Sequence, residues 1–146
     1  MKPPEVIAAV FLIYASLVDI RTKEIDPVVT AVTALTGAVY VCLERSGDLR
    51  GVALSLLPGF SLFLFGLISR GRFGAGDGLT IMTIGLFLSA DAVLVSVMAG
   101  LLLSSCFAAG VLIAGRKRHL AQRGSEVLPF LPFLLGGYSL CLVLNV

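Results

Sequence analysis

"GRFGAGDGLT", residues 71–80, places a single acid, Asp77, among four glycines and between two long apolar runs. An ionisable group at membrane depth costs about 2.5–3.5 kcal/mol on insertion scales, and such groups usually mark working sites. Gly74 and Gly76 remove side chains on the approach to Asp77, so the backbone can take unusual dihedrals and another segment can come close. This stretch is therefore the first candidate for a functional site.

The composition of the whole chain points to a membrane protein. Its 146 residues are 58% hydrophobic and 14% charged, and the mean hydropathy is +1.02. An ordinary soluble domain is about half apolar and a quarter charged, so lipid must be the solvent for much of this surface. A net charge of +2 and the absence of tryptophan give no basis for nucleic-acid binding. The three cysteines form no CxxC pair, so neither zinc nor another cofactor is expected.

Six apolar runs predict an all-α polytopic membrane protein with six transmembrane helices in one bundle, a single domain over residues 1–146. The predicted spans are 4–18, 27–43, 51–69, 77–90, 92–114 and 127–145. The first and fourth spans are short for a hydrocarbon layer of about 30 Å. To cross it, each must draw in the acid at its end, which places Asp19 and Asp77 at the membrane boundary.

The distribution of lysine and arginine predicts the orientation. Eight of the eleven basic residues fall in 19–26, 70–76 and 115–126, and the other three are Lys2, Arg45 and Arg50. This bias puts both termini outside and the three basic loops in the cytoplasm. Asp19 and Asp77, far apart in sequence, are then expected on the same, cytoplasmic, side of the cell membrane.

The remaining acids have structural explanations. Asp26 stands before a proline, the pattern of a helix N-cap. Asp91 is expected to cap the fifth span, and Asp48 and Arg45 are expected to be solvated charges of an outer loop.

Structural alternatives also exist for the two selected acids. On position alone, Asp77 also fits a simple helix cap, and Asp19 fits an interfacial charge paired with Arg21. A nucleotide-binding loop does not fit the glycines, because no Lys-Ser/Thr follows and no complete GxGxxG is present. Close helix packing through small residues explains the glycines but not the acid.

Three motifs, "GAGD" at residues 74–77, "DIRTKEIDPVVT" from Asp19 and "PFLPFLL" from Pro129, together resemble those of type IV prepilin peptidases and preflagellin peptidases. "GAGD", residues 74–77, is similar to the GxGD motif of membrane-embedded aspartyl proteases. "DIRTKEIDPVVT", from Asp19, resembles the aspartate, basic stretch and Ile-Pro that follow the first span in that family. "PFLPFLL", from Pro129, resembles its late proline motif. The likeness covers about residues 11–137. It has one departure, because Asp26 stands between Ile25 and Pro27.

The resemblance implies a set of functional residues. Asp19 and Asp77 would be the catalytic pair, Gly74 and Gly76 would shape the second site, and the late motif would contribute Pro129 and Phe130. The chain has no room for the cysteine-rich insert of larger members, which also methylate the pilin. It therefore resembles the minimal, peptidase-only form.

The implied activity is that of an aspartic endopeptidase at the cytoplasmic membrane face. Its substrates would be prepilin-like membrane proteins, namely Flp/Tad pilins, pseudopilins or archaeal flagellins, whose short basic leader it removes. Helix ends suggest the roles, because the start of a helix favours the charged Asp77 as base and the end of another favours the neutral Asp19 as acid. The sequence leaves a homodimer open.

Other functions remain as alternatives. A small ion- or proton-coupled transporter also needs intramembrane carboxylates, although both acids are expected near one face and no paired inverted repeats are seen. A structural bundle in a secretion machine would leave the glycine-flanked acid unexplained. A presenilin-like protease that cuts deep in a helix is less consistent with acids near the cytoplasmic edge.

Overall fold

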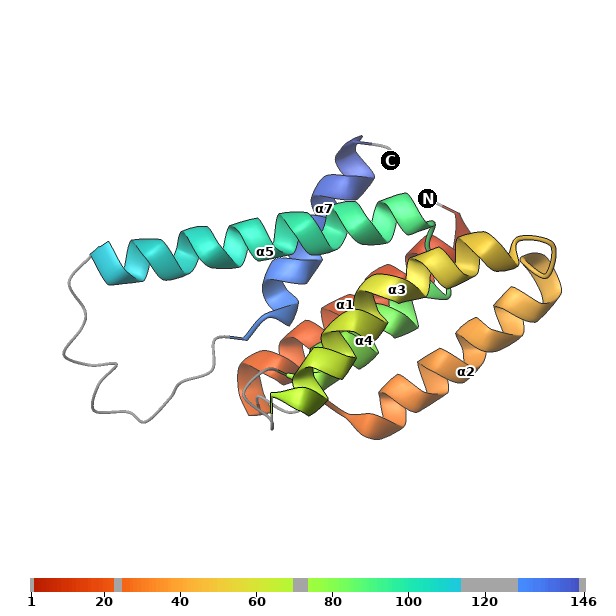
Figure 1. The fold of residues 1–146 in the computed structure, drawn as a ribbon, viewed down its shortest axis with the longest axis horizontal. Coiled ribbons are helices and arrows are strands. Elements are labelled where there is room, and N and C mark those ends of the chain that lie inside the picture. The colour runs from red at the N-terminus through yellow and green to blue at the C-terminus, as the bar shows by residue number, and fades with distance from the viewer. Residues whose placement is uncertain (1, 23–24, 70–73, 114–128, 145–146) are drawn as a thin grey trace.

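The computed structural model describes residues 2–22, 25–69, 74–113 and 129–144, and these residues are mostly helical. The helices are α1 (Pro3–Thr22), α2 (Pro27–Glu44), α3 (Leu49–Ile68), α4 (Ala75–Gly85), α5 (Ala90–Ile113) and α7 (Leu131–Leu144) (Figure 1). By length and composition, α1, α2, α3 and α5 can each cross a membrane. The prediction of an all-α polytopic membrane protein is confirmed.

The orientation stays a prediction, because most of the residues that carry it are not described. Arg21 lies in the last turn of α1. The other basic residues of the predicted cytoplasmic loops lie outside the described residues, and they are Lys23, Arg70, Arg72, Arg116, Lys117, Arg118 and Arg123.

Several helix bounds differ from those predicted. Helix α1 continues through Asp19, and α7 starts at Leu131 instead of 127. Helix α4 has 11 residues, which is only about 16 Å of helix. The chain leaves the helix after Gly85, although Leu86–Leu88 continue the apolar run. Irregular backbone is tolerated at membrane depth where protein covers it, and Phe87 and Leu88 are both buried in the core.

The core gathers around α4. Ile81 and Ile84 of α4 are fully buried and pack in one cluster with Leu12 of α1, Val93 of α5 and Leu134 of α7. Large apolar side chains on the outer faces of the helices are exposed instead. This distribution fits lipid as the solvent of the outer surface.

Glycines bring α3 and α4 into close contact. A Cβ atom built on Gly78 would overlap the backbone nitrogen of Phe63, and one on Gly85 would lie 2.6 Å from the carbonyl oxygen of Ser55. Small residues allow helix backbones to approach in this way. Helix packing is therefore the explanation for Gly78, the last glycine of residues 71–80, but not for Gly74 and Gly76.

Helix α2 lies at the edge of the molecule (Figure 1) and packs chiefly against α4. Gly37 is its one buried residue among those described, and a Cβ atom there would lie 2.8 Å from Cβ of Leu86. The Tyr40 ring stacks on Phe87 with centroids 6.1 Å apart. The contact is thus made by the second half of α2 and the turn after α4.

Arg45 and Asp48, which follow α2, make hydrogen bonds and an ion pair. The sequence predicted them as solvated charges of an outer loop. Arg45 donates from Nη1 to the carbonyl oxygens of Leu86, at 3.5 Å, and Leu88, at 2.9 Å. Asp48 caps α3 by accepting from the Gly51 backbone nitrogen at 3.0 Å, and it lies 3.6 Å from Arg45. Arg45 therefore donates to two carbonyls of the irregular segment that follows α4.

Two predicted caps have different outcomes. Asp26 caps α2, as expected, with its side chain accepting from the backbone nitrogens of Val28 and Val29. Asp91 does not cap α5. It lies in the first turn of that helix, and the hydroxyl of Ser89 accepts from the Ala92 backbone nitrogen at 3.3 Å.

Replacing Arg45 by glutamine should destabilise the bundle by about 2–3 kcal/mol, since hydrogen bonds from a charged donor to two part-buried carbonyls are lost. Thermal unfolding in detergent should show a melting temperature several degrees lower. Arg50→Gln is the matched control, because Arg50 is exposed on α3. Equal melting temperatures for the two variants would contradict the proposed role of Arg45.

Candidate active site

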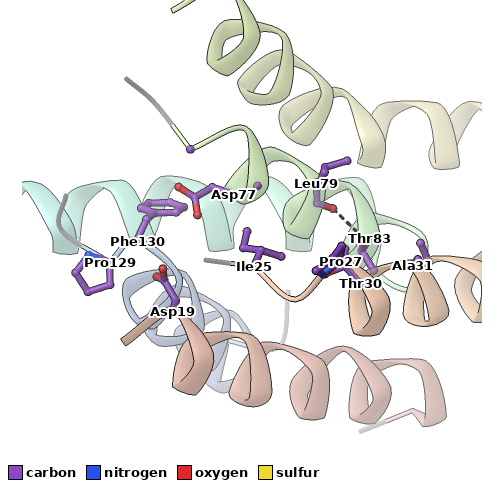
Figure 2. Close-up of a pocket in the computed structure, with 13 residues that line it drawn as sticks. Asp19, Ile25, Pro27, Thr30, Ala31, Asp77, Leu79, Thr83, Pro129 and Phe130 are labelled. Atoms are coloured by element: carbon purple, nitrogen blue, oxygen red, sulfur yellow. Dashed lines mark hydrogen bonds between the residues drawn. The ribbon is translucent and has the colours of Figure 1, made fainter. Parts of the chain in front are cut away.

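A cavity of about 720 Å³ brings together every site residue predicted from the sequence. Its walls come from the end of α1, the segment before α2 and the first half of α2, α4 as far as Thr83, and the segment before α7 (Figure 2). The predicted residues that line it are Asp19, Gly74, Gly76, Asp77, Pro129 and Phe130. The two aspartates, distant in sequence, thus face one space.

Asp19 is held by the start of α7. It lies in the last turn of α1 and is 8% exposed. Its Oδ2 accepts a hydrogen bond from the backbone nitrogen of Leu131, the first residue of α7, at 3.2 Å. The first backbone N–H groups of a helix have no partner within the helix, so the Asp19 carboxylate supplies one for α7 and is fixed in return.

The late proline motif places that helix start. Pro129 and Phe130 are partly buried and immediately precede α7, and the Phe130 carbonyl accepts from the backbone nitrogens of Phe133 and Leu134. Figure 2 shows the Phe130 ring beside the Asp77 carboxylate, with Pro129 on the side of Asp19. Both residues therefore form one wall of the cavity.

Asp77 is the third residue of α4, and Gly74 is the N-cap of that helix. The backbone of Gly74 is ordinary, with φ −65° and ψ 98°, so the expectation of unusual dihedrals is wrong there. The reason for the glycine is space, because a Cβ atom on Gly74 would lie 2.6 Å from Oδ2 of Asp77. The Asp77 carboxylate lies beside the α carbon of Gly74.

Gly76 makes room for the segment that enters α2. A Cβ atom on Gly76 would overlap Cδ1 of Ile25, which also lines the cavity. The second glycine of the GxGD motif therefore brings the loop after Asp19 against the helix that carries Asp77.

Asp26, the departure from the family pattern, anchors this segment. Besides capping α2, it accepts a hydrogen bond from the Tyr14 hydroxyl of α1 at 3.1 Å. The backbone N–H of Val29 and the Tyr14 hydroxyl hold the pKa of Asp26 below its ordinary value, so it stays ionised as a cap. The additional residue thus ties the start of α2 to α1, next to Ile25.

The rest of the cavity wall is apolar. Thr30 donates its hydroxyl to the Asp26 carbonyl and Thr83 donates to the Leu79 carbonyl, each at 2.9 Å. Among the described lining residues, Asp19 and Asp77 are the only charged ones. Carboxylates that share a site of this kind titrate as a pair, and one can hold a proton while the other accepts one.

The sequence suggested that helix ends distinguish the roles of the two acids. The structure gives no such distinction. Asp77 lies at the start of α4, as expected. Asp19 lies in the last turn of α1 but also contacts the start of α7 through Leu131. Because the N-terminus of a helix favours negative charge, α7 offsets the effect of α1 on Asp19.

The fold and this cavity define a multi-pass α-helical membrane protein with two carboxylates between its helices. Residues 6–114 match the model of the type IV leader peptidase family, and the chain belongs to that family. It is therefore a peptidase of the leader-peptidase type. The match includes both aspartates and the GxGD glycines, whereas Pro129 and Phe130 lie beyond it. Neither curated proteins nor solved structures gave a match to the chain.

Proposed function

We propose that the chain is an aspartic endopeptidase in which Asp19 and Asp77 are the catalytic pair of a single transmembrane domain. The observation that carries this proposal is that the two carboxylates line one cavity, although they come from different helices. Membership of the leader peptidase family supplies the reaction class, hydrolysis of a peptide bond.

A carboxylate pair can hydrolyse a peptide bond by dividing the proton transfers. The ionised member takes a proton from a water molecule as that water attacks the scissile carbonyl carbon, and the protonated member donates to the carbonyl oxygen. The tetrahedral intermediate then breaks its C–N bond as the amine leaving group takes a proton from the pair. The Leu131 N–H keeps the Asp19 carboxylate oriented during these steps.

The position of the cavity fits a substrate cut beside a membrane helix. Helix α1 ends at the cavity, and α2, α4 and α7 begin there, so the carboxylates lie at one end of the bundle. We propose that this end lies on the cytoplasmic side of the cell membrane. The substrate is a prepilin-like precursor, a Flp/Tad pilin, pseudopilin or archaeal flagellin, with a short basic leader followed by an apolar helix.

Co-expression with candidate precursors tests this function. The wild-type chain should convert a precursor to a faster-migrating product on a gel, and mass spectrometry of the product should place the cut at the junction of the leader and the apolar helix. Uncut precursors, together with ion flux through liposomes that hold the purified chain, would overturn the proposal in favour of a transporter.

A further inference from the structure

The cavity continues away from the carboxylates along α2 and α4. Its lining there consists of Ala31 and Ala34 on α2 and of Leu79 and Thr83 on α4, which we call the α2–α4 groove. We propose that the α2–α4 groove receives the first turns of the substrate's transmembrane helix, on the carboxyl side of the cut bond. This inference rests on the proposed function and assigns a binding surface for it.

The groove exists because α2 is attached to the bundle on either side of it. Before the groove, Ile25 lies against Gly76. Beyond it, Gly37 lies against Leu86, and Arg45 donates to the carbonyls after α4. Between these attachments α2 presents alanines, whose short side chains leave the space open.

The chemistry of the lining selects an apolar helix as the occupant. The Thr83 hydroxyl donates to its own helix, and the other groove residues are aliphatic. A segment that enters such a surface from lipid must satisfy its own backbone groups, which a helix does. Small residues such as Ala31 and Ala34 allow a second helix to pack closely. A basic leader has no charge partner along this surface among the described lining residues, so it must lie on the other side of the carboxylates.

The length of the groove sets how much of the substrate it contacts. From Asp77 to Thr83, α4 rises about 9 Å, and from Pro27 to Ala34, α2 rises about 10 Å. The cavity, from the carboxylates to the far end of the α2–α4 groove, therefore spans about two turns of helix, or roughly the first six or seven residues after the cut bond. Because Asp77 lies at one end of this length, a helix that extends into the groove brings its N-terminal end to the carboxylates.

A bulky side chain in the groove tests the proposal. Ala34→Phe should lower the rate of precursor cleavage by about tenfold or more, because the substrate helix can no longer seat next to the carboxylates. Ala38→Phe is the matched control, since Ala38 lies one turn further along α2, is exposed and does not line the groove. It should cleave at the wild-type rate. Equal rates for the two variants would overturn the groove as the docking surface.

Cross-linking tests the same contact without a bulky substitution. In the Asp77→Asn background, with Cys42, Cys106 and Cys141 replaced by serine, Ala34→Cys should form a disulfide with cysteines introduced into the first seven residues of the substrate helix. Ala38→Cys should not. Cross-links of equal yield at both positions, or from Ala38→Cys alone, would overturn the groove while leaving wild-type cleavage intact. Failure of the wild type to cut any precursor would instead count against the proposed function itself.

Discussion

Replacing Asp77 by asparagine should lower the rate of precursor cleavage by about 10²–10⁴-fold, and Asp19→Asn should have an effect of the same size. An amide has nearly the shape of a carboxylic acid but cannot take a proton from water at neutral pH or deliver one to the carbonyl oxygen. Either substitution therefore removes one of the two proton transfers. The rate is measured from the conversion of a purified precursor in liposomes.

The structure indicates that these variants keep the fold. In Asp19→Asn, the amide oxygen can still accept the hydrogen bond that the carboxylate receives from Leu131. Asp91→Asn is the matched control for the same chemical change, because Asp91 is exposed in the first turn of α5. It should cleave at the wild-type rate. Cleavage by Asp77→Asn at more than a tenth of the wild-type rate would show that this carboxylate is not catalytic.

The all-α, membrane-spanning character of the described helices was accessible from the sequence, because apolar runs interrupted by charge directly reflect a lipid solvent. The early end of α4 was not accessible. Leu86–Leu88 continue the apolar run, but the chain leaves the helix there, and Arg45 from a distant part of the sequence donates to the carbonyls of Leu86 and Leu88. A hydrogen bond between residues this far apart gives no pattern in the local sequence, so Arg45 was expected to be solvated.

The candidate site, too, was only partly predictable from the sequence. Asp19 and Asp77 stood out because each closes a short span, and the structure places both on one cavity. The contact between Asp19 and Leu131 joins residues 112 positions apart. It could not be derived from spacing, and it removes the basis for assigning the acid and base from helix ends. The sequence identified the two carboxylates that line the cavity, whereas the contact that orients Asp19 depends on tertiary packing.

Gly74 and Gly78 flank Asp77 in one short stretch, yet the structure gives them different partners. A Cβ atom on Gly78 would meet the backbone of Phe63, which cannot move without separating α3 from α4. A Cβ atom on Gly74 would meet the carboxylate of Asp77, the free end of a side chain. An alanine at position 74 can therefore be accommodated by rotation of that side chain, at little cost to the fold.

Gly74→Ala should for this reason separate activity from stability. The displaced Asp77 carboxylate should cost about 10²-fold in the rate of cleavage, the size of effect expected when a reacting group is misplaced by about 1 Å. The change of N-cap residue should cost only about 1 kcal/mol of stability, and thermal unfolding in detergent measures that part.

Gly110→Ala is the control for Gly74→Ala, because a Cβ atom on Gly110 of α5 would have no described neighbour within 4 Å. It should leave the cleavage rate unchanged. If Gly74→Ala instead kept the wild-type rate, the carboxylate of Asp77 would not need the position that it has beside Gly74. The first glycine of the motif would then serve only the start of α4. A much lower rate with only a small fall in melting temperature would assign that glycine to the placement of the Asp77 carboxylate.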